Sequence, residues 1–270
     1  MPLRFSHTPR LVKLLLTFVL TLPLVLPVNF VLINPGQGSP LFPKLLNIEP
    51  TAAAPVTTYP ADGQMYLLSI WVTNPETEIL GYQVLRCWGQ KDCVVVPRSV
   101  VYQRETNDKA EIALGKKEMA KSQSTALLAT KHLFAKYHSD IDLSQMTDTS
   151  IKISLKNTGG PSGGLIFALG LTELLTPENI LQGRKIAATG TISANGKVGP
   201  IGGVEEKITA ARKTGTQLIF ISRENCDEVP QKVAGVGVIA VSTLEEAYKS
   251  LINSQNSNFQ GVKGCTNLDS

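Results

Sequence analysis

Two glycine-rich segments each carry one side chain that could take part in covalent catalysis. The first is Asn157-Thr158-Gly159-Gly160-Pro161-Ser162-Gly163-Gly164, which leads into an apolar stretch over 165–175. This pattern predicts a tight turn that delivers the Ser162 hydroxyl to the start of a buried helix. Gly160 and Gly163 would let the backbone approach a substrate, Pro161 would support the same turn, and N–H groups at the helix start would stabilise a developing oxyanion. In the alternative interpretation, Ser162 only caps a helix after a glycine turn.

The second segment supplies a lysine. It reads Val198-Gly199-Pro200-Ile201-Gly202-Gly203-Val204-Glu205-Glu206-Lys207 and opens a predicted helix over 203–214. In a helix, Lys207 shares a face with Val204, Ile208 and Ala211. A lysine in an apolar stripe is desolvated, which lowers its pKa and suits it to act as a general base near neutral pH. The alternative is a lysine that extends from the edge of the stripe to solvent.

Together the two segments resemble the proteolytic domain of the Lon protease family, peptidases that use a Ser-Lys dyad. The resemblance rests on the P-S-G-G turn, on Thr189-Gly190-Thr191-Ile192, on the P-I-G-G-x-x-x-K helix start and on their order, and it covers about residues 151–251. It implies an α/β fold related to domain 2 of ribosomal protein S5. It also implies that Ser162 is the nucleophile, Lys207 the general base and Thr189 a support for the lysine amine. Thr191 departs from the family, because many Lon domains have a glutamate there.

The elements that must position these residues alternate between strands and helices. Strands are predicted over 65–73, 151–155, 185–192, 216–222 and 236–241, and helices over 108–136, 165–175, 203–214, 224–233 and 243–252. A hairpin is predicted over 81–96. The β-α-β series favours a mixed α/β proteolytic core over 151–253, preceded over 63–150 by N-terminal strands and the long helix.

The N-terminal residues favour a membrane anchor. Basic residues occur in 1–13, and the next twenty residues, 14–33, carry no charge. This pattern predicts a transmembrane helix in the cell membrane, with a cytoplasmic N-terminus and an extracytoplasmic catalytic part. A cleaved signal peptide is the alternative. The proline-rich stretch 34–62 is predicted to be a linker, and the polar stretch 254–270 a disordered tail.

Composition excludes several classes of site. A net charge of +4, from 26 basic and 22 acidic residues without a basic stripe, argues against nucleic-acid binding. The three histidines lie outside both glycine-rich segments, which argues against a Ser-His-Asp triad and a histidine zinc site, so no metal or cofactor is expected. Cys87 and Cys93 could form a disulfide if this part lies outside the cytosol, or could remain free thiols.

These observations predict an ATP-independent, membrane-anchored serine endopeptidase. No G-x-x-x-x-G-K-[ST] phosphate loop and no ATPase domain fit the sequence, and the stretch 137–150 is too short to hold the PDZ domain of the membrane-anchored Lon-like relatives. The expected substrates are therefore peptides and unstructured polypeptide segments. The family resemblance implies a homo-oligomer, with a hexamer expected. The alternative function is an inactive, membrane-tethered Lon-like scaffold.

Overall fold

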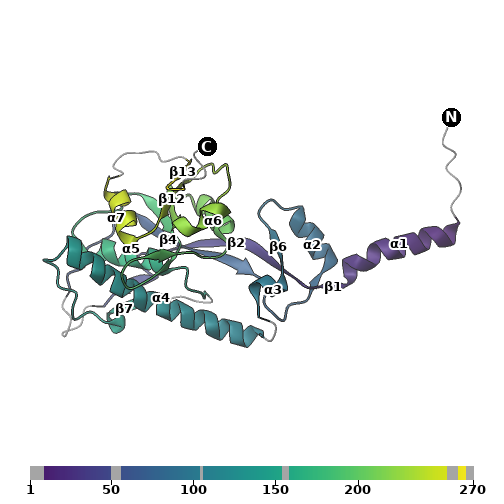
Figure 1. The fold of residues 1–270 in the computed structure, drawn as a ribbon, viewed down its shortest axis with the longest axis horizontal. Coiled ribbons are helices and arrows are strands. Elements are labelled where there is room, and N and C mark those ends of the chain that lie inside the picture. Colours follow the sequence, from purple (N-terminus) through teal and green to yellow (C-terminus); the bar gives the residue numbers. More distant parts are fainter. Residues whose placement is uncertain (1–8, 50–55, 104–105, 154–157, 254–260, 266–270) are drawn as a thin grey trace. The chain divides into compact units, whose positions relative to one another are not determined.

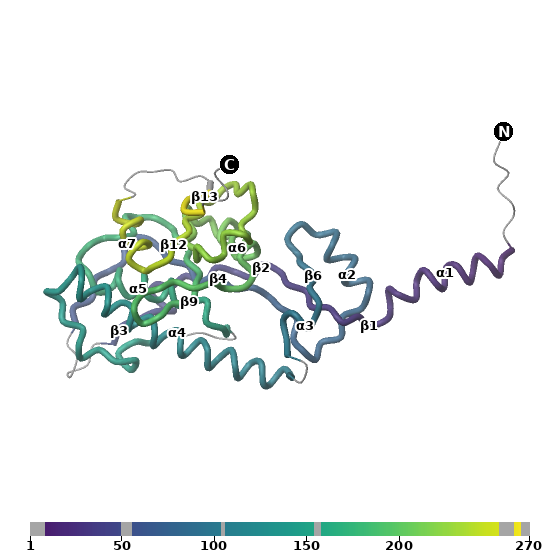
Figure 2. The backbone as a smooth tube through the Cα atoms, in the orientation of Figure 1, coloured from purple at the N-terminus to yellow at the C-terminus, as the bar shows by residue number. Residues whose placement is uncertain are grey.

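The computed structural model describes residues 9–49, 56–103, 106–153, 158–253 and 261–265. The chain forms two compact units, a smaller one from residues 1–34 and 71–108 and a larger one from residues 35–70 and 109–270. It passes between them within strands β2 (Phe30–Pro40) and β4 (Gln64–Val72) and at the start of helix α4 (Asp108–Tyr137), as Figures 1 and 2 trace.

The smaller unit is built from short elements. They are α1 (Arg10–Val25), β1 (Pro27–Val28), the first part of β2, β5 (Ile79–Leu80), α2 (Gly81–Trp88), β6 (Val94–Pro97) and α3 (Arg98–Val101). β1 pairs antiparallel with β5, and the start of β2 pairs antiparallel with β6. Leu32, Ile79, Val84 and Cys87 form its buried core. A disulfide joins Cys87 to Cys93, as one of the two alternatives from the sequence predicted.

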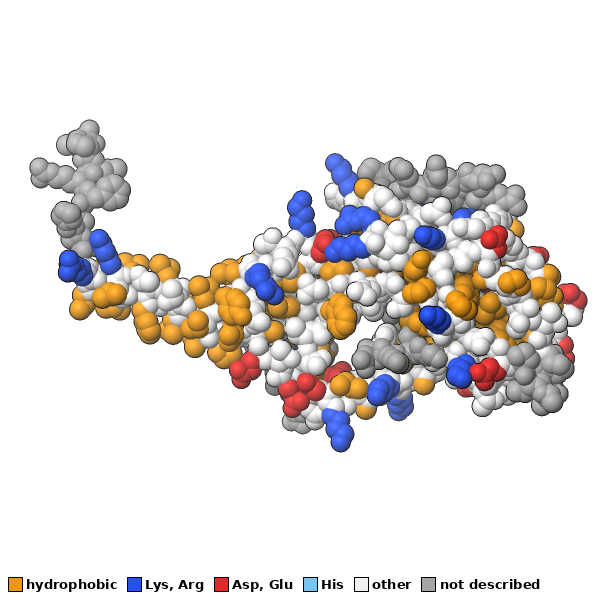
Figure 3. Space-filling view, turned by 180° about the vertical axis from the view of Figure 1, so that it is seen from behind, with side chains coloured by type: hydrophobic (Ala, Val, Ile, Leu, Met, Phe, Trp, Pro, Cys, Tyr) orange, Lys and Arg blue, Asp and Glu red, His pale blue; other side chains and the backbone are white. Residues whose placement is uncertain are grey.

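Two predictions in this unit are wrong. The predicted transmembrane helix over 14–33 does not extend that far, because α1 ends at Val25 and the chain continues as β1 and β2. Pro27 cannot donate to a continuing helix and favours extended backbone before it. Within the described residues, every helix is too short or too polar to cross a membrane. Apolar side chains nevertheless cover the surface of α1 (Figure 3).

The hairpin predicted over 81–96 is the second error. Helix α2 occupies 81–88, and only Val94–Pro97 is a strand. Val84 and Cys87 are three residues apart, so they lie on one helical face, and both are buried. In a strand, residues three apart would lie on opposite faces, so this spacing favours the helix.

The larger unit contains a mostly parallel sheet. Its strands run in the order β13-β12-β11-β8-β4-β2, and β4, β8 (Lys185–Ala188), β11 (Leu218–Ser222), β12 (Gly237–Val241) and β13 (Gly261–Lys263) are mutually parallel. Short antiparallel pairs join β3 (Leu46–Ile48) to β7 (Ile151–Ile153) and β9 (Thr191–Ile192) to β10 (Val198–Gly199). The helices are α4, α5 (Gly164–Leu175), α6 (Val204–Thr214) and α7 (Leu244–Asn253), with short 3-10 helices at Asp148–Ser150 (η1) and Arg223–Glu228 (η2).

Alternate residues of the strands bury two faces of this sheet. In β11, Leu218 and Phe220 belong to the core shared with α4, α5 and α7, whereas Ile219 and Ile221 belong to the core shared with α6. Such alternation follows from the period of two in a strand, and burial on both faces explains the continuous apolar sequence of β11. The larger unit is therefore a sheet with helices on both faces, and the mixed α/β prediction is confirmed.

The predicted linker over 34–62 is wrong in its described part. Residues 35–40 continue strand β2, Leu46–Ile48 forms β3, and Leu41 and Leu46 are completely buried. The prolines suggested an extended stalk, but prolines are also tolerated in edge strands, and Pro35 and Pro40 lie in β2. The leucines between them supply the core.

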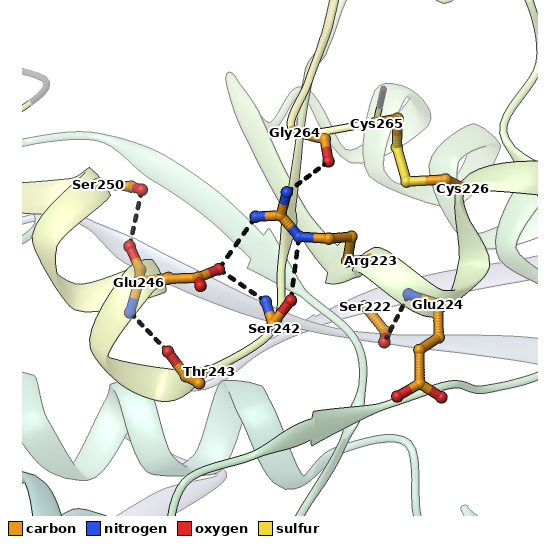
Figure 4. A network of polar contacts seen from close by, with 10 residues as sticks. All are labelled: Ser222, Arg223, Glu224, Cys226, Ser242, Thr243, Glu246, Ser250, Gly264 and Cys265. Atoms are coloured by element: carbon orange, nitrogen blue, oxygen red, sulfur yellow. Dashed lines mark hydrogen bonds and ion pairs between the residues drawn. A yellow bond between two sulfur atoms is a disulfide. The ribbon is translucent and has the colours of Figure 1, made fainter. Parts of the chain in front are cut away.

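The predicted disordered tail is partly wrong. Residues 254–260 and 266–270 lie outside the described residues, but Gly261–Lys263 forms β13 beside β12, and Cys265 forms a disulfide with Cys226. Arg223 holds this region by donating to Ser242 Oγ at 3.0 Å and to the Gly264 carbonyl at 2.9 Å (Figure 4). These long-range contacts leave no local signal in a polar sequence. The helix predicted over 224–233 is the shorter η2.

Candidate active site

Ser162 lies in a tight turn immediately before helix α5. Gly160 adopts φ +92°, a conformation that a residue with a side chain rarely takes. A Cβ atom at Gly163 would lie 2.7 Å from the Phe167 ring and 3.1 Å from Leu67 Cδ1, so only glycine fits between the turn and the sheet. Glycine is thus required at position 160 by the backbone conformation and at position 163 by close packing.

Hydrogen bonds hold three consecutive residues of this turn. The Gly160 N–H donates to the Gly115 carbonyl at 2.9 Å, and Ser122 Oγ donates to the Pro161 carbonyl at 3.0 Å. The carbonyl of Ser162 accepts from the Gly190 N–H at 2.9 Å. The backbone around the candidate nucleophile is therefore fixed by α4 and by the segment after β8.

The N–H groups of Ser162 and Gly163 are oriented by the same turn. Within the described chain, neither of them donates a hydrogen bond. N–H groups at the start of a helix can bind developing negative charge. The turn therefore has the backbone donors that an oxyanion would need.

Lys207 lies in the first turns of α6, whose N-cap Gly203 adopts φ +71°. Its side chain is only 3% exposed, and burial lowers the pKa of Lys207 from 10.5 to about 8. The carboxylates of Glu206 and Glu228 oppose this shift, because negative charge favours the protonated amine. The prediction of a buried lysine with a lowered pKa is confirmed, and the alternative of a lysine extending to solvent is wrong.

Two residues near Lys207 were not found from the sequence. Asn225 is buried; its Oδ1 accepts from the Ile201 N–H at 3.0 Å, and its Nδ2 donates to the Ile201 carbonyl at 2.8 Å. The same Nδ2 lies 2.7 Å from Glu228 Oε1, so Asn225 also orients one of the carboxylates that act on Lys207. Asn225 follows α6 by many residues, and no spacing in the sequence connects it to Ile201.

Ser162 and Lys207 come from opposite faces of the sheet and approach its same edge. Thr189 directly follows β8, and its hydroxyl donates to the Ser162 carbonyl at 3.4 Å. On the other face, a Cβ atom at Gly203 would lie 2.9 Å from Ile70, near the end of the neighbouring strand β4. Both candidate residues thus lie at the carboxyl edge of the β4–β8 pair, where α/β sheets bind ligands.

The structure does not bring the two side chains into direct contact. In the described part of the chain, Lys207 Nζ forms no hydrogen bond or ion pair, and Ser162 Oγ forms no hydrogen bond. Thr189 bonds to the backbone of Ser162 and not to the lysine amine. Catalytic hydrogen bonds often form only in the complex with substrate, so the roles of Ser162, Lys207 and Thr189 stay predictions. No group of metal-binding side chains occurs among the described residues.

The fold and this site define a class of protein: an α/β domain with a serine on a glycine turn and a desolvated lysine at one sheet edge. Residues 106–254 match the C-terminal proteolytic domain of Lon protease (S16). The chain therefore belongs to the Lon protease family, and the resemblance found in the two glycine-rich segments is confirmed.

Individual relatives match between a third and a half of the chain. Lon protease 2 of Bacillus subtilis is 31% identical over 140 residues, which cover 52% of this chain and 24% of that protein. The Lon protease of Campylobacter concisus is 37% identical over 98 residues, 34% of this chain and 12% of the relative. The mitochondrial Lon protease homolog of Caenorhabditis elegans is 32% identical over 139 residues, 49% of this chain and 14% of the relative. The chain thus spans a quarter or less of the length of these relatives.

Proposed function

We propose that this protein is a serine endopeptidase with Ser162 as nucleophile and Lys207 as general base. One observation carries the proposal: a lysine with a pKa of about 8 is buried at the same sheet edge as a serine on a rigid glycine turn. At pH 8 about half of such a lysine is neutral and able to accept a proton, whereas an ordinary lysine is almost entirely protonated.

In the proposed reaction, Ser162 Oγ attacks the carbonyl carbon of a peptide bond while its proton passes to Lys207 Nζ. The N–H groups of Ser162 and Gly163 bind the oxyanion, an interaction worth about 3 kcal/mol per donor in other enzymes. The intermediate then collapses, and Lys207 returns the proton to the leaving amine. A water molecule, deprotonated by Lys207, releases the acyl group from Ser162 and completes the hydrolysis.

The direct contact between Ser162 Oγ and Lys207 Nζ must form when substrate or another subunit binds. Neighbouring copies packed against the long helix α4 would bring the two side chains together, so the proposal includes a homo-oligomer, with a hexamer expected from the family resemblance. Thr189 would then orient the lysine amine as well as the serine backbone. Light scattering with activity measured at decreasing protein concentration tests this part: a fully active monomer would refute it.

The substrate and the location are part of the proposal. We expect cleavage of peptides and unstructured polypeptide segments without ATP, since the 270 residues contain no phosphate-loop motif. The disulfides Cys87–Cys93 and Cys226–Cys265 support a location outside the cytosol, because disulfides persist in oxidising compartments. The basic residues of 1–13 and the apolar side chains of α1 support attachment of the N-terminal segment to a membrane. Cell fractionation with alkaline extraction, and protease accessibility in intact cells, test both expectations.

Two substitutions test the catalytic roles. Ser162→Ala and Lys207→Ala should each abolish cleavage of a casein-like substrate without unfolding the domain. A fluorophosphonate probe should label Ser162 in the assembled wild-type protein. Activity that survives in both variants would refute the dyad, and an assembled protein that takes no label would support the inactive scaffold instead.

A further inference from the structure

We propose that helix α4 positions the nucleophile and that Gly115 and Ser122 are the residues through which it does so. The proposal rests on the proposed role of Ser162, and it adds two residues outside both glycine-rich segments. The larger unit places the backbone of α4 directly against the turn that carries Ser162. Neither residue would touch substrate, so each is a positioning residue.

Gly115 allows helix and turn to meet backbone to backbone. Its carbonyl accepts the Gly160 N–H at 2.9 Å. A Cβ atom at Gly115 would lie 3.3 Å from Gly159 Cα, and a Cβ atom at Gly159 would lie 2.9 Å from Gly115 Cα. A glycine within a helix destabilises it relative to alanine, so its presence at this contact has a reason beyond helix formation.

Ser122 makes the second contact. Its side chain is 5% exposed, and Oγ donates to the Pro161 carbonyl at 3.0 Å. Helical serines commonly bond to the carbonyl four residues earlier, as Ser124 does with Ala120. Ser122 instead directs its hydroxyl across to the turn. A Cβ atom at Gly164 would lie 3.1 Å from this Oγ, so the serine also occupies the space beside the start of α5.

The two contacts act on the residues immediately before the nucleophile. Gly115 and Ser122 are seven residues apart, about two helical turns, so they lie on one face of α4. They fix the N–H of Gly160 and the carbonyl of Pro161, while Gly190 fixes the carbonyl of Ser162 from the other side. A small shift of α4 would therefore move the Ser162 hydroxyl and the oxyanion donors together.

The experiment compares Gly115→Ala and Ser122→Ala with two matched controls in the full-length protein. Gly89→Ala adds a Cβ atom that meets nothing closer than 3.5 Å, and Ser124→Ala removes a hydroxyl from the same helix that does not bond to the turn. The readouts are the rate constant for fluorophosphonate labelling of Ser162, kcat and KM for a peptide, and the thermal unfolding midpoint.

A misplacement of about 1 Å can cost about a hundredfold in rate, and Gly115→Ala requires a shift of a few tenths of an ångström, so we expect both α4 variants to lower the labelling rate and kcat by about tenfold, with KM nearly unchanged. Gly115→Ala should do so with little change in the unfolding midpoint, because the gain in helix propensity offsets the tight contact with Gly159. Ser122→Thr, which retains the donor, should recover most of the rate. Wild-type labelling rates in both α4 variants would overturn the inference and leave the proposed function standing. Failure of the wild type itself to label would refute the proposed function first.

Discussion

Replacing Lys207 with methionine should abolish proteolysis and at the same time stabilise the domain. Burial lowers the pKa of Lys207 from 10.5 to about 8. Because a tenfold change in a protonation equilibrium corresponds to about 1.4 kcal/mol, lowering the pKa from 10.5 to about 8 makes the ammonium about 3 kcal/mol less favourable in the folded than in the unfolded chain. Methionine has a similar length, carries no charge and adapts to irregular apolar surroundings.

The effect of this substitution should depend on pH in a defined way. Between about pH 8 and 10.5 the unfolded wild-type chain binds more protons than the folded chain, so wild-type stability rises with pH in this window. Below pH 8 both states are protonated and the penalty is constant. Lys207→Met should therefore be more stable than wild type by up to about 3 kcal/mol at pH 7, and the difference should disappear near pH 11.

Urea unfolding at pH 7, 9 and 10.5 measures this difference, and peptide hydrolysis measures activity. Lys213→Met, on the exposed face of the same helix, is the matched control and should change neither the stability nor the activity by much. Equal stability of the two variants at pH 7 would refute the desolvation of Lys207. Hydrolysis by Lys207→Met at the wild-type rate would refute its role as general base, whatever the stability.

Three further predictions concern other residues of the larger unit. Burial raises the pKa of Glu173 to about 7, so the folded chain binds more protons than the unfolded chain between pH 4.5 and 7. Wild-type stability should therefore fall by up to about 3 kcal/mol as the pH rises through this range. Glu173→Gln should remove this loss, which unfolding at pH 5 and 7.5 measures. Asn225→Ala leaves the Ile201 N–H and carbonyl unpaired and should cost about 1–3 kcal/mol in urea unfolding. It should also lower kcat, because Ile201 precedes α6, the helix that carries Lys207. An unchanged kcat would limit Asn225 to a structural role. Replacing Cys226 and Cys265 together by serine removes a link across 39 residues and should cost about 4 kcal/mol in urea unfolding; in reductant, which opens Cys87–Cys93 in both proteins, wild type and variant should become equally stable.

The elements that carry the site could be predicted from local sequence. The glycine turn followed by an apolar run gave α5, and the helical period placed Lys207 on the apolar face of α6, where it is buried. Each of these predictions depends only on residues within one or two helical turns. Such patterns are reliable because a helix buries its stripe in almost any tertiary context.

Features that depend on distant contacts could not be predicted in the same way. Residues 35–48 resembled a linker by composition, but pairing with other strands and burial of Leu41 and Leu46 make them part of the core. Gly115 and Asn225 contact the two glycine-rich segments from far along the chain, and neither carries a local signal for that contact. Composition alone therefore predicts too little regular structure where pairing with distant strands stabilises a segment.

The sheet explains why a serine and a lysine from opposite faces can serve one reaction. Side chains on the two faces are separated by the strands themselves, so the two helix starts can approach each other only beyond the strand ends. β8 ends at Ala188, and the chain after it stays compact: a Cβ atom at Gly190 would lie 2.8 Å from Val198 Cγ1, so β9 and β10 fold closely over this edge. Thr189 and Gly190 then contact the serine turn, and the β9–β10 segment leads directly into α6. The short β8 strand and the small residues after it therefore bring Ser162 and Lys207 to one edge of the sheet, as the proposed reaction requires.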